Sequence, residues 1–318
     1  MAEQKICCYL DLLGFSNFTK SKDPLVYCSV LENYAQVLQQ KLNSFLTVRP
    51  YQAFESFIPF SDGIFITAAI DRGDLFFQEL SDFYTTCVRW NIDESFFNQN
   101  SNDPFLHETD EFGTNRKITR KHYLTLFRGG ISIGDVEYFS QKCIFPSFTN
   151  ANVNNVPNVA GSGITAAVKL EETEGFKGGR ILVDAAVLSH LSEGTRNKYI
   201  LENTNIKNKM GTVESIDSGE VLWANSLIET TNDKNLVFSE FLDFVNYFLR
   251  IYKYYDKNIS SENNDRICNV YYETLKIIIL TMDRFCNISN ITKSVKEYLN
   301  IPFNNEILIK KICDEVCI

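Results

Sequence analysis

The sequence predicts an α+β fold with a βαββαβ core and a helical extension at its C-terminal end. Three observations predict it. Short β-prone apolar runs alternate with longer segments in which apolar residues recur every three or four positions. Two of the β-prone runs are joined by the tight turn Ser61-Asp62-Gly63, which is typical of a hairpin. From about residue 235 onward, the apolar residues show only the three- and four-residue spacing of helices.

The first half of the chain supplies the core. Its predicted elements are, in order, strand 5–12, helix 24–46, strands 51–60 and 63–70, helix 73–90 and strand 123–133. This order is that of a ferredoxin-like βαββαβ sheet. Residues 91–122 are rich in Asn, Asp and Glu and poor in aliphatic residues, so we expect an inserted polar arm there.

The second half continues the same domain and then becomes helical. A second polar stretch covers 139–158. The further predicted elements are helix 161–174, a strand and a helix within 179–191, strands within 198–224 with turns at Met210-Gly211 and Ser218-Gly219, and helices 235–256, 264–287 and 290–299. We therefore predict one domain over 1–230 and a helical extension over 231–318.

Composition excludes several classes of protein. The 31 Lys and Arg residues are outnumbered by 40 Asp and Glu, which argues against a basic nucleic-acid-binding face. Nine cysteines occur without a CxxC pair and mostly inside apolar runs, as expected for reduced core thiols in the cytosol. There is no signal-peptide pattern, and the longest apolar run is too short to span a bilayer. We expect a cytoplasmic protein without a membrane or nucleic-acid partner.

Two carboxylates carry most of the chemical information. Asp11 ends the predicted first strand, and Asp62 lies at the tip of the predicted hairpin. Either one alone is explained by a turn or a cap. In a βαββαβ sheet, however, the first strand lies beside the hairpin, so both carboxylates converge at one end of the sheet. Paired carboxylates repel each other unless a cation such as Mg²⁺ or Mn²⁺ lies between them.

The backbone after Asp11 is a candidate phosphate-binding segment. Gly14, Phe15, Ser16 and Asn17 lead toward a predicted helix, and free N–H groups there can bind phosphate oxygens. The signal is weak by itself.

The strand after the polar arm contains a third feature. Paired glycines, Gly129 and Gly130, follow Arg128 and indicate a close backbone approach or a bulge. Arg128 has two interpretations, an ion pair with a neighbouring carboxylate or a phosphate ligand. The sequence does not decide between them.

The predicted helix after Gly161 and Gly163 contains a fourth feature. Thr165 and Lys169 are four residues apart, so they share one face of the helix. A hydroxyl and an ammonium group on one face can bind phosphate or ribose oxygens. The alternative is an ordinary solvated helix face.

These four features together resemble the class III nucleotidyl cyclase family. The first strand of that family carries Asp, two residues, Gly and Phe, as in Asp11-Leu12-Leu13-Gly14-Phe15. Its hairpin carries a second metal-binding Asp, which matches Asp62. A following strand reads Arg-x-Gly-[Ile/Val]-x-x-Gly, which matches residues 128–134.

The resemblance extends through the next helix. The family has Asn, three residues, Arg and then Leu-Glu, whereas this chain has Thr165 and Lys169 before Leu170-Glu171. The strand and helix within 179–191 also resemble the element that follows in the family. The resemblance covers roughly residues 5–195 with two insertions.

The resemblance implies a two-metal mechanism. Two divalent ions, Mn²⁺ or Mg²⁺, are held by Asp11, Asp62 and the backbone carbonyl of Leu12, while the backbone of 15–17 binds phosphates. In the family the metals come from one subunit and the helix with the Asn/Arg pair from the other. The resemblance therefore implies a homodimer with composite active sites and a nucleoside triphosphate substrate.

Departures from the family narrow the expected substrate. The adenine-reading Lys of adenylate-making members is replaced by Ile58, and their adenine-reading Asp corresponds to Asn158. The Asn/Arg pair is replaced by Thr165 and Lys169. The segments around residues 7–18, 61–66 and 128–136 are more similar to the pyrimidine cyclases of the Pycsar antiphage system. Those enzymes make cyclic CMP or cyclic UMP for antiviral defence and act with a separate effector.

Three alternatives remain at this stage. One is an adenylate or guanylate cyclase of class III. A second is another βαββαβ enzyme, such as a GGDEF-type cyclase or a polymerase palm, although the hairpin reads SDGI and contains no GGDEF string. The third is a non-catalytic nucleotide sensor with the cyclase fold. The sequence also leaves the choice between UTP and CTP open.

Overall fold

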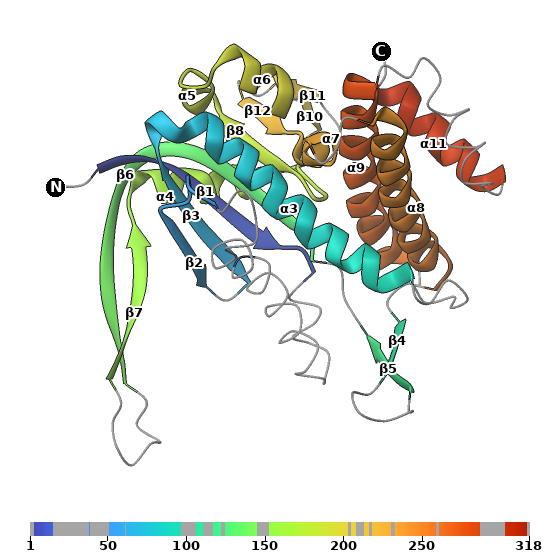
Figure 1. Ribbon diagram of the computed structural model, residues 1–318, viewed down its shortest axis with the longest axis horizontal. Helices are drawn as coiled ribbons and strands as arrows, with labels where there is room; N and C mark the ends of the chain where they lie inside the picture. The colour runs from blue at the N-terminus through green and yellow to red at the C-terminus, as the bar shows by residue number, and fades with distance from the viewer. Residues whose placement is uncertain are drawn as a thin grey trace.

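The computed structural model (Figure 1) describes most of the chain. By number, the described residues are 3–14, 38, 51–60, 62–96, 106–110, 117–121, 125–144, 153–202, 205–207, 213–215, 218–229, 233–258, 261–286 and 303–316. Apart from residue 38, the predicted helix 24–46 lies outside them. So do the predicted helix 290–299 and the predicted turn Met210-Gly211.

An eight-stranded sheet forms the centre of the molecule (Figure 1). Its strands lie in the order β2-β3-β1-β6-β8-β12-β9, and β7 pairs with β6. Their bounds are β1 Glu3–Leu12, β2 Ser56–Phe60, β3 Gly63–Ala69, β6 Phe127–Ile144, β7 Val153–Ala160, β8 Ile181–Asp184, β9 Ile200–Leu201 and β12 Ser218–Val221. Strand β1 is antiparallel to both β3 and β6, whereas β6 and β8 are parallel. The order β2-β3-β1-β6 is that of a βαββαβ sheet, and the predicted α+β class is confirmed.

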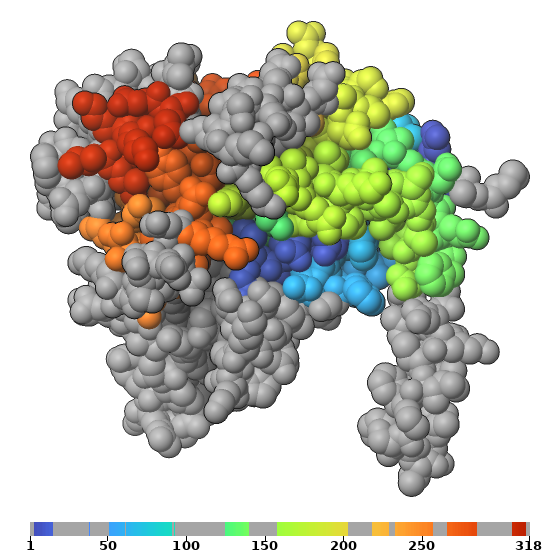
Figure 2. Space-filling model, turned by 180° about the vertical axis from the view of Figure 1, so that it is seen from behind, coloured from blue at the N-terminus to red at the C-terminus, as the bar shows by residue number. Residues whose placement is uncertain are grey.

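Helices cover both faces of this sheet. The described helices are α3 Gly73–Phe96, α4 Ser162–Glu171, α5 Ala185–Leu188, α6 Glu193–Tyr199, α7 Ser226–Glu229, α8 Lys234–Asn258, α9 Ser261–Cys286 and α11 Phe303–Val316, with short 3-10 helices η1 Ile70–Arg72 and η2 Trp223–Asn225. Helix α3 crosses one face (Figure 1), and α4 lies over β1 on the other (Figure 2). None of the helices in the described ranges has the length and apolar character needed to cross a membrane.

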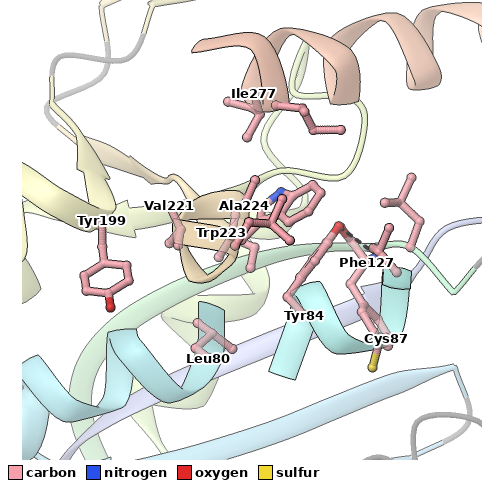
Figure 3. Packing of buried hydrophobic residues seen from close by; sticks show 14 of the residues in the cluster. Leu80, Tyr84, Cys87, Phe127, Tyr199, Val221, Trp223, Ala224 and Ile277 are labelled. Carbon is pink, nitrogen blue, oxygen red and sulfur yellow. Dashed lines mark hydrogen bonds between the residues drawn. The ribbon is translucent and has the colours of Figure 1, made fainter. Parts of the chain in front are cut away.

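The main hydrophobic core lies between the sheet, α3 and the C-terminal helices (Figure 3). At its centre the ring of Tyr84 stacks on Trp223 with 4.4 Å between centroids. The Tyr84 hydroxyl donates to the carbonyl of Phe127 at 2.5 Å, and the Trp223 indole N–H donates to the carbonyl of Gly179 at 2.7 Å. The polar atoms of these large buried rings are thus satisfied, as burial requires.

The helical extension shares this core with the sheet. Phe241 and Phe248 of α8 and Leu275 of α9 are fully buried in the same cluster as residues of β1 and β6. Arg180, just before β8, binds Glu220 of β12 with 2.5 Å between Nη2 and Oε2, and Glu273 of α9 at 3.1 Å. The predicted boundary near residue 230 therefore separates two segments of the chain that are packed as one structure.

Glycines let α4 approach the sheet on its other face. A Cβ atom added to Gly130 would lie 2.2 Å from the carbonyl oxygen of Ala167, and one added to Gly163 would lie 2.5 Å from the sulfur of Cys7. Such distances are far below van der Waals contact. The close backbone approach that the paired glycines predict is confirmed at Gly130.

Several predicted boundaries differ from the structure. The predicted turn Ser218-Gly219 is wrong, because both residues are buried in strand β12. Strand β6 runs on to Ile144 and pairs with β7, so the polar stretch 139–158 contains a long hairpin. Helix α3 continues to Phe96, and a small hairpin, β4 Leu106–Asp110 with β5 Lys117–Lys121, lies within the predicted arm. A second small hairpin pairs β10 Asn205–Lys207 with β11 Val213–Ser215.

Candidate active site

Pairing of β1 with its neighbours places the two candidate aspartates at the same end of the sheet. Asp11 lies opposite Gly63 on β3 and opposite Arg128 on β6. Asp62 directly precedes β3, and its carbonyl oxygen accepts a hydrogen bond from the Leu12 N–H at 2.9 Å. Both aspartates are half-buried. The structure therefore brings together the three residues that the resemblance assigns to metal binding.

Electrostatics at this end of the sheet disfavour a bare charge on Asp11. Burial raises the pKa of Asp11 to about 7, and the nearby carboxylates of Glu171 and Asp62 contribute to the increase. Arg128 and a hydrogen bond with Tyr9 act in the opposite direction but do not outweigh it. A cation bound between the carboxylates would favour the ionised form instead.

Arg128 forms an ion pair with Glu171 at the end of α4. Its Nε donates to Glu171 Oε1 at 2.5 Å, its Nη2 also contacts that oxygen, and its Nη1 lies 3.5 Å from the carbonyl oxygen of Phe176. The Glu171 side chain is 6% exposed. Burial raises the pKa of Glu171 although Arg128 opposes the increase. The ion pair that is one interpretation of Arg128 is thus observed, and a role in binding phosphate stays a prediction.

Glu171 is the site residue that sequence reasoning did not single out. It occurs in the sequence as the last residue of the motif Leu170-Glu171, but its contact with Arg128 joins positions 43 residues apart. Helical periodicity offers one signal, because Gly163, Ala167 and Glu171 are spaced four apart and all three are buried. A charged residue on an apolar helix face indicates a buried partner.

The predicted phosphate-binding segment is described only at its start. Gly14 has a φ of 83°, a backbone conformation that glycine adopts without strain. Phe15, Ser16 and Asn17 lie outside the described residues, so their role stays a prediction.

Thr165 and Lys169 share one face of α4, as their spacing predicts. Both are exposed, whereas Gly163, Ala167 and Glu171 form the buried face that packs on the sheet. The Thr165 hydroxyl donates to the carbonyl of Gly161 at 3.1 Å, a bond within the helix. Within one chain these two side chains therefore lie outside the face of α4 that packs on the sheet.

The two positions aligned with adenine-reading residues lie elsewhere. Asn158 is on β7 opposite Phe139, eleven residues along β6 from Arg128, which corresponds to roughly 36 Å of extended strand. Its side-chain oxygen accepts from the Val159 N–H at 2.8 Å. Ile58 is 8% exposed and belongs to a small apolar cluster on the α4 face. One chain alone does not bring Asn158 to the aspartates.

The two carboxylates suit a hard divalent cation whose coordination is completed by other ligands. Carboxylate oxygens are the ligands that Mg²⁺ and Mn²⁺ prefer, and Asp11 and Asp62 supply two such groups. In the part of the chain that the structure describes, no three His, Cys, Asp or Glu side chains are grouped to hold a metal ion. Substrate phosphate oxygens or water would have to complete the coordination.

Comparisons with known proteins give likeness of shape only. No protein-family model matches the sequence, and no curated protein matches it. A structure of a bacterial light-regulated adenylyl cyclase is 12% identical, with a TM-score of 0.42 over 70% of this chain and 52% of the other. A Trypanosoma brucei adenylate cyclase structure, determined in the monomeric state, is 14% identical with a TM-score of 0.40 over 69% and 90%.

Proposed function

We propose that this chain is a pyrimidine nucleotide cyclase, which converts UTP or CTP to 3′,5′-cyclic UMP or cyclic CMP and pyrophosphate. The observation that carries the proposal is the convergence of Asp11 and Asp62 beside Leu12 at one end of the sheet. The order and spacing of the four sequence features support it. In the reaction the ribose 3′-oxygen bonds to the α-phosphorus. The bond between the α-phosphorus and the oxygen that bridges to the β-phosphorus breaks, so pyrophosphate leaves, and a base takes up the hydroxyl proton.

The residues of the chain have distinct roles in this proposal. Asp11 and Asp62 hold the divalent ions, with the Leu12 carbonyl as a further ligand. When bound, these ions would lower the pKa of the 3′-hydroxyl and neutralise the pyrophosphate leaving group. By analogy with the cyclase family, a carboxylate oxygen of Asp11 would accept the 3′-hydroxyl proton. Arg128 keeps Glu171 paired, so the burial of a third carboxylate beside the aspartates is compensated.

The active site is composite in this proposal, formed by two copies of the chain. Thr165 and Lys169 are exposed on α4, outside the face that packs on the sheet, so they are available to complete a site in a partner chain. Exposed aromatic side chains on β2 and β6, namely Phe60, Tyr138 and Phe139, supply apolar surface for such contact. Lys169 would then place a positive charge near the α-phosphate in the transition state.

A mixing experiment tests the composite site. Asp62→Ala and Lys169→Ala chains, each inactive alone, form heterodimers that retain one intact site. Unfolding and refolding them together should restore about a quarter of wild-type activity, because half of the dimers are mixed and each has one good site. No recovery in verified heterodimers would show that both residues act within one chain.

The pyrimidine preference is supported by what replaces the adenine-reading residues. Ile58 is buried in an apolar cluster and offers no hydrogen bond, and Asn158 replaces an acidic side chain. A separate effector activated by the cyclic nucleotide and an antiviral role follow from the same resemblance and belong to the proposal. So does the cytoplasmic location that the cysteine pattern predicts.

The decisive experiment supplies the purified chain with Mn²⁺ and each of the four ribonucleoside triphosphates, and identifies products by mass spectrometry. We expect cyclic UMP or cyclic CMP with equimolar pyrophosphate, and at least about tenfold less product from ATP and GTP. Preferred conversion of ATP or GTP would establish the adenylate or guanylate alternative. No turnover of any triphosphate would favour the non-catalytic sensor, which the Thr165 and Lys169 replacements also support.

A further inference from the structure

A pocket of about 600 Å³ lies where the helical extension meets the loop between α4 and β8. Four separate parts of the chain line it. The polar and aromatic residues that face it are Lys177 of the loop, Tyr252 of α8, Arg266, Asn269 and Tyr272 of α9, and Lys311 of α11. Its volume is within the range of small-molecule sites in proteins.

The pocket concentrates positive charge in an acidic protein. Lys177, Arg266 and Lys311 come from three different segments and are exposed. Among the described residues that line the pocket, none is acidic. Within the described ranges, neither Lys177 nor Arg266 forms a salt bridge with another side chain. Lys311 lies near Glu315, whose pKa it helps to lower, but no carboxylate lines the pocket itself in the described part of the chain. Three cations that converge on such a pocket favour an anionic ligand.

Neighbouring carboxylates are occupied by other partners. Glu315 accepts from the Tyr272 hydroxyl at 2.8 Å and pairs with Lys276 at 3.0 Å. Glu273 is bound to Arg180 at 3.1 Å. The Lys311 ammonium lies 5.0 Å from the centre of the Tyr272 ring, a cation–π contact that holds it at the pocket.

We propose that this pocket binds a phosphorylated small molecule of nucleotide size. Arg266 and the two lysines supply phosphate contacts, since guanidinium and ammonium groups are the usual partners of phosphate oxygens. The half-buried Tyr252 supplies flat, largely apolar surface for the rest of the ligand, while Tyr272 positions Lys311. This site differs in chemistry from the aspartate pair, because cations of the protein bind the phosphate and no divalent metal is required.

Calorimetric titration of the full-length chain in EDTA tests this directly. The probes are uridine 5′-monophosphate, adenosine 5′-monophosphate, pyrophosphate and uncharged uridine. We expect both monophosphates to bind and uridine not to bind. The double variant Arg266→Ala/Lys311→Ala should lower monophosphate affinity at least about tenfold, whereas the control Lys310→Ala, on the same helix but not lining the pocket, should change it less than about twofold.

The remaining outcomes are equally informative. The charge-preserving variant Arg266→Lys/Lys311→Arg should retain most of the affinity, and its circular dichroism should match that of the alanine variant if both are folded. Absence of monophosphate binding by the wild-type chain, or equal affinity of the wild type and the alanine variant, would overturn the site. Pyrophosphate that binds as tightly as the nucleotides would show a bare anion site and overturn the nucleotide-sized ligand. The EDTA condition keeps these results separate from metal-dependent binding at Asp11 and Asp62.

Discussion

The two faces of the central sheet differ in how much apolar packing they carry. Residues of β1 alternate between them, so Ile6, Cys8 and Leu10 face the α3 side and join the large hydrophobic core. Cys7, Tyr9 and Asp11 face the α4 side, where the apolar cluster is small. A single strand thus supplies core packing to one layer and a half-buried carboxylate to the other.

This difference separates stability from chemistry. On the α3 face, large rings fill the space and their polar atoms are hydrogen-bonded, as with Tyr84 and Trp223. On the α4 face, helix α4 packs closely against Gly130. Charged groups and exposed aromatic side chains lie on this face, and the pKa of Asp11 is raised there. Substitutions on the two faces should therefore affect different measurements.

Asp62→Ala should have the largest effect on activity and little effect on folding. Removing one of two cation-binding carboxylates should lower cyclic nucleotide formation at least about a thousandfold, as measured by mass spectrometry with Mn²⁺. The half-buried side chain lies at a strand end, so circular dichroism and elution volume should be unchanged. Wild-type product levels from this variant would remove Asp62 from the proposed metal site.

Two matched Phe→Ala variants, one on each face of the sheet, should differ in their effect on stability. Phe76 of α3 is fully buried in the large core, so Phe76→Ala should lower the free energy of unfolding by about 3–5 kcal/mol. Phe65 of β3 is half-buried on the α4 face, where its ring stacks on that of Tyr9 with 4.9 Å between centroids. Phe65→Ala should lower the free energy of unfolding by less than about half as much as Phe76→Ala. Equal losses in urea unfolding would show that the α4 face stabilises the fold as strongly as the core does.

Lys169→Ala should lower turnover with little change in substrate affinity. A charge that acts near the α-phosphate in the transition state should be worth about a hundredfold in kcat, while triphosphate affinity should change less than about threefold. The control is Lys310→Ala, also an exposed lysine but on α11 and outside the proposed active site, which should leave kcat unchanged. Parallel losses in kcat and affinity would instead mean that Lys169 binds ground-state substrate.

Local patterns predict the arrangement at the sheet end but not its long-range contacts. Neighbouring strands and a tight hairpin suffice to place Asp62 beside Asp11, because strand pairing follows from the order of elements. The Arg128–Glu171 pair depends on how α4 lies across β6, which periodicity does not specify. Ser218-Gly219 reads as a turn by composition, yet a close contact with Ile200 makes a small residue necessary inside a strand.

The smallest expected effect is a pH-dependent contact on the α3 side of the molecule. Burial alone would raise the pKa of Asp74, but hydrogen bonds from the Ser192 N–H, the Ser192 hydroxyl and the Thr195 hydroxyl outweigh it and lower the pKa. Asp74 therefore stabilises the fold above the unfolded-state pKa of about 4, and this contribution is lost as the pH falls through the lower folded-state value.

Asp74→Asn should accordingly be less stable than the wild type at pH 7, by no more than about 1 kcal/mol because the contact is exposed to solvent. The difference should narrow as the pH falls below about 4, since the wild-type carboxylate then becomes neutral as well. Urea unfolding of both proteins across this range measures it. A gap that stays constant with pH would mean that the amide disrupts packing at the start of α6, and that the Asp74 charge contributes nothing.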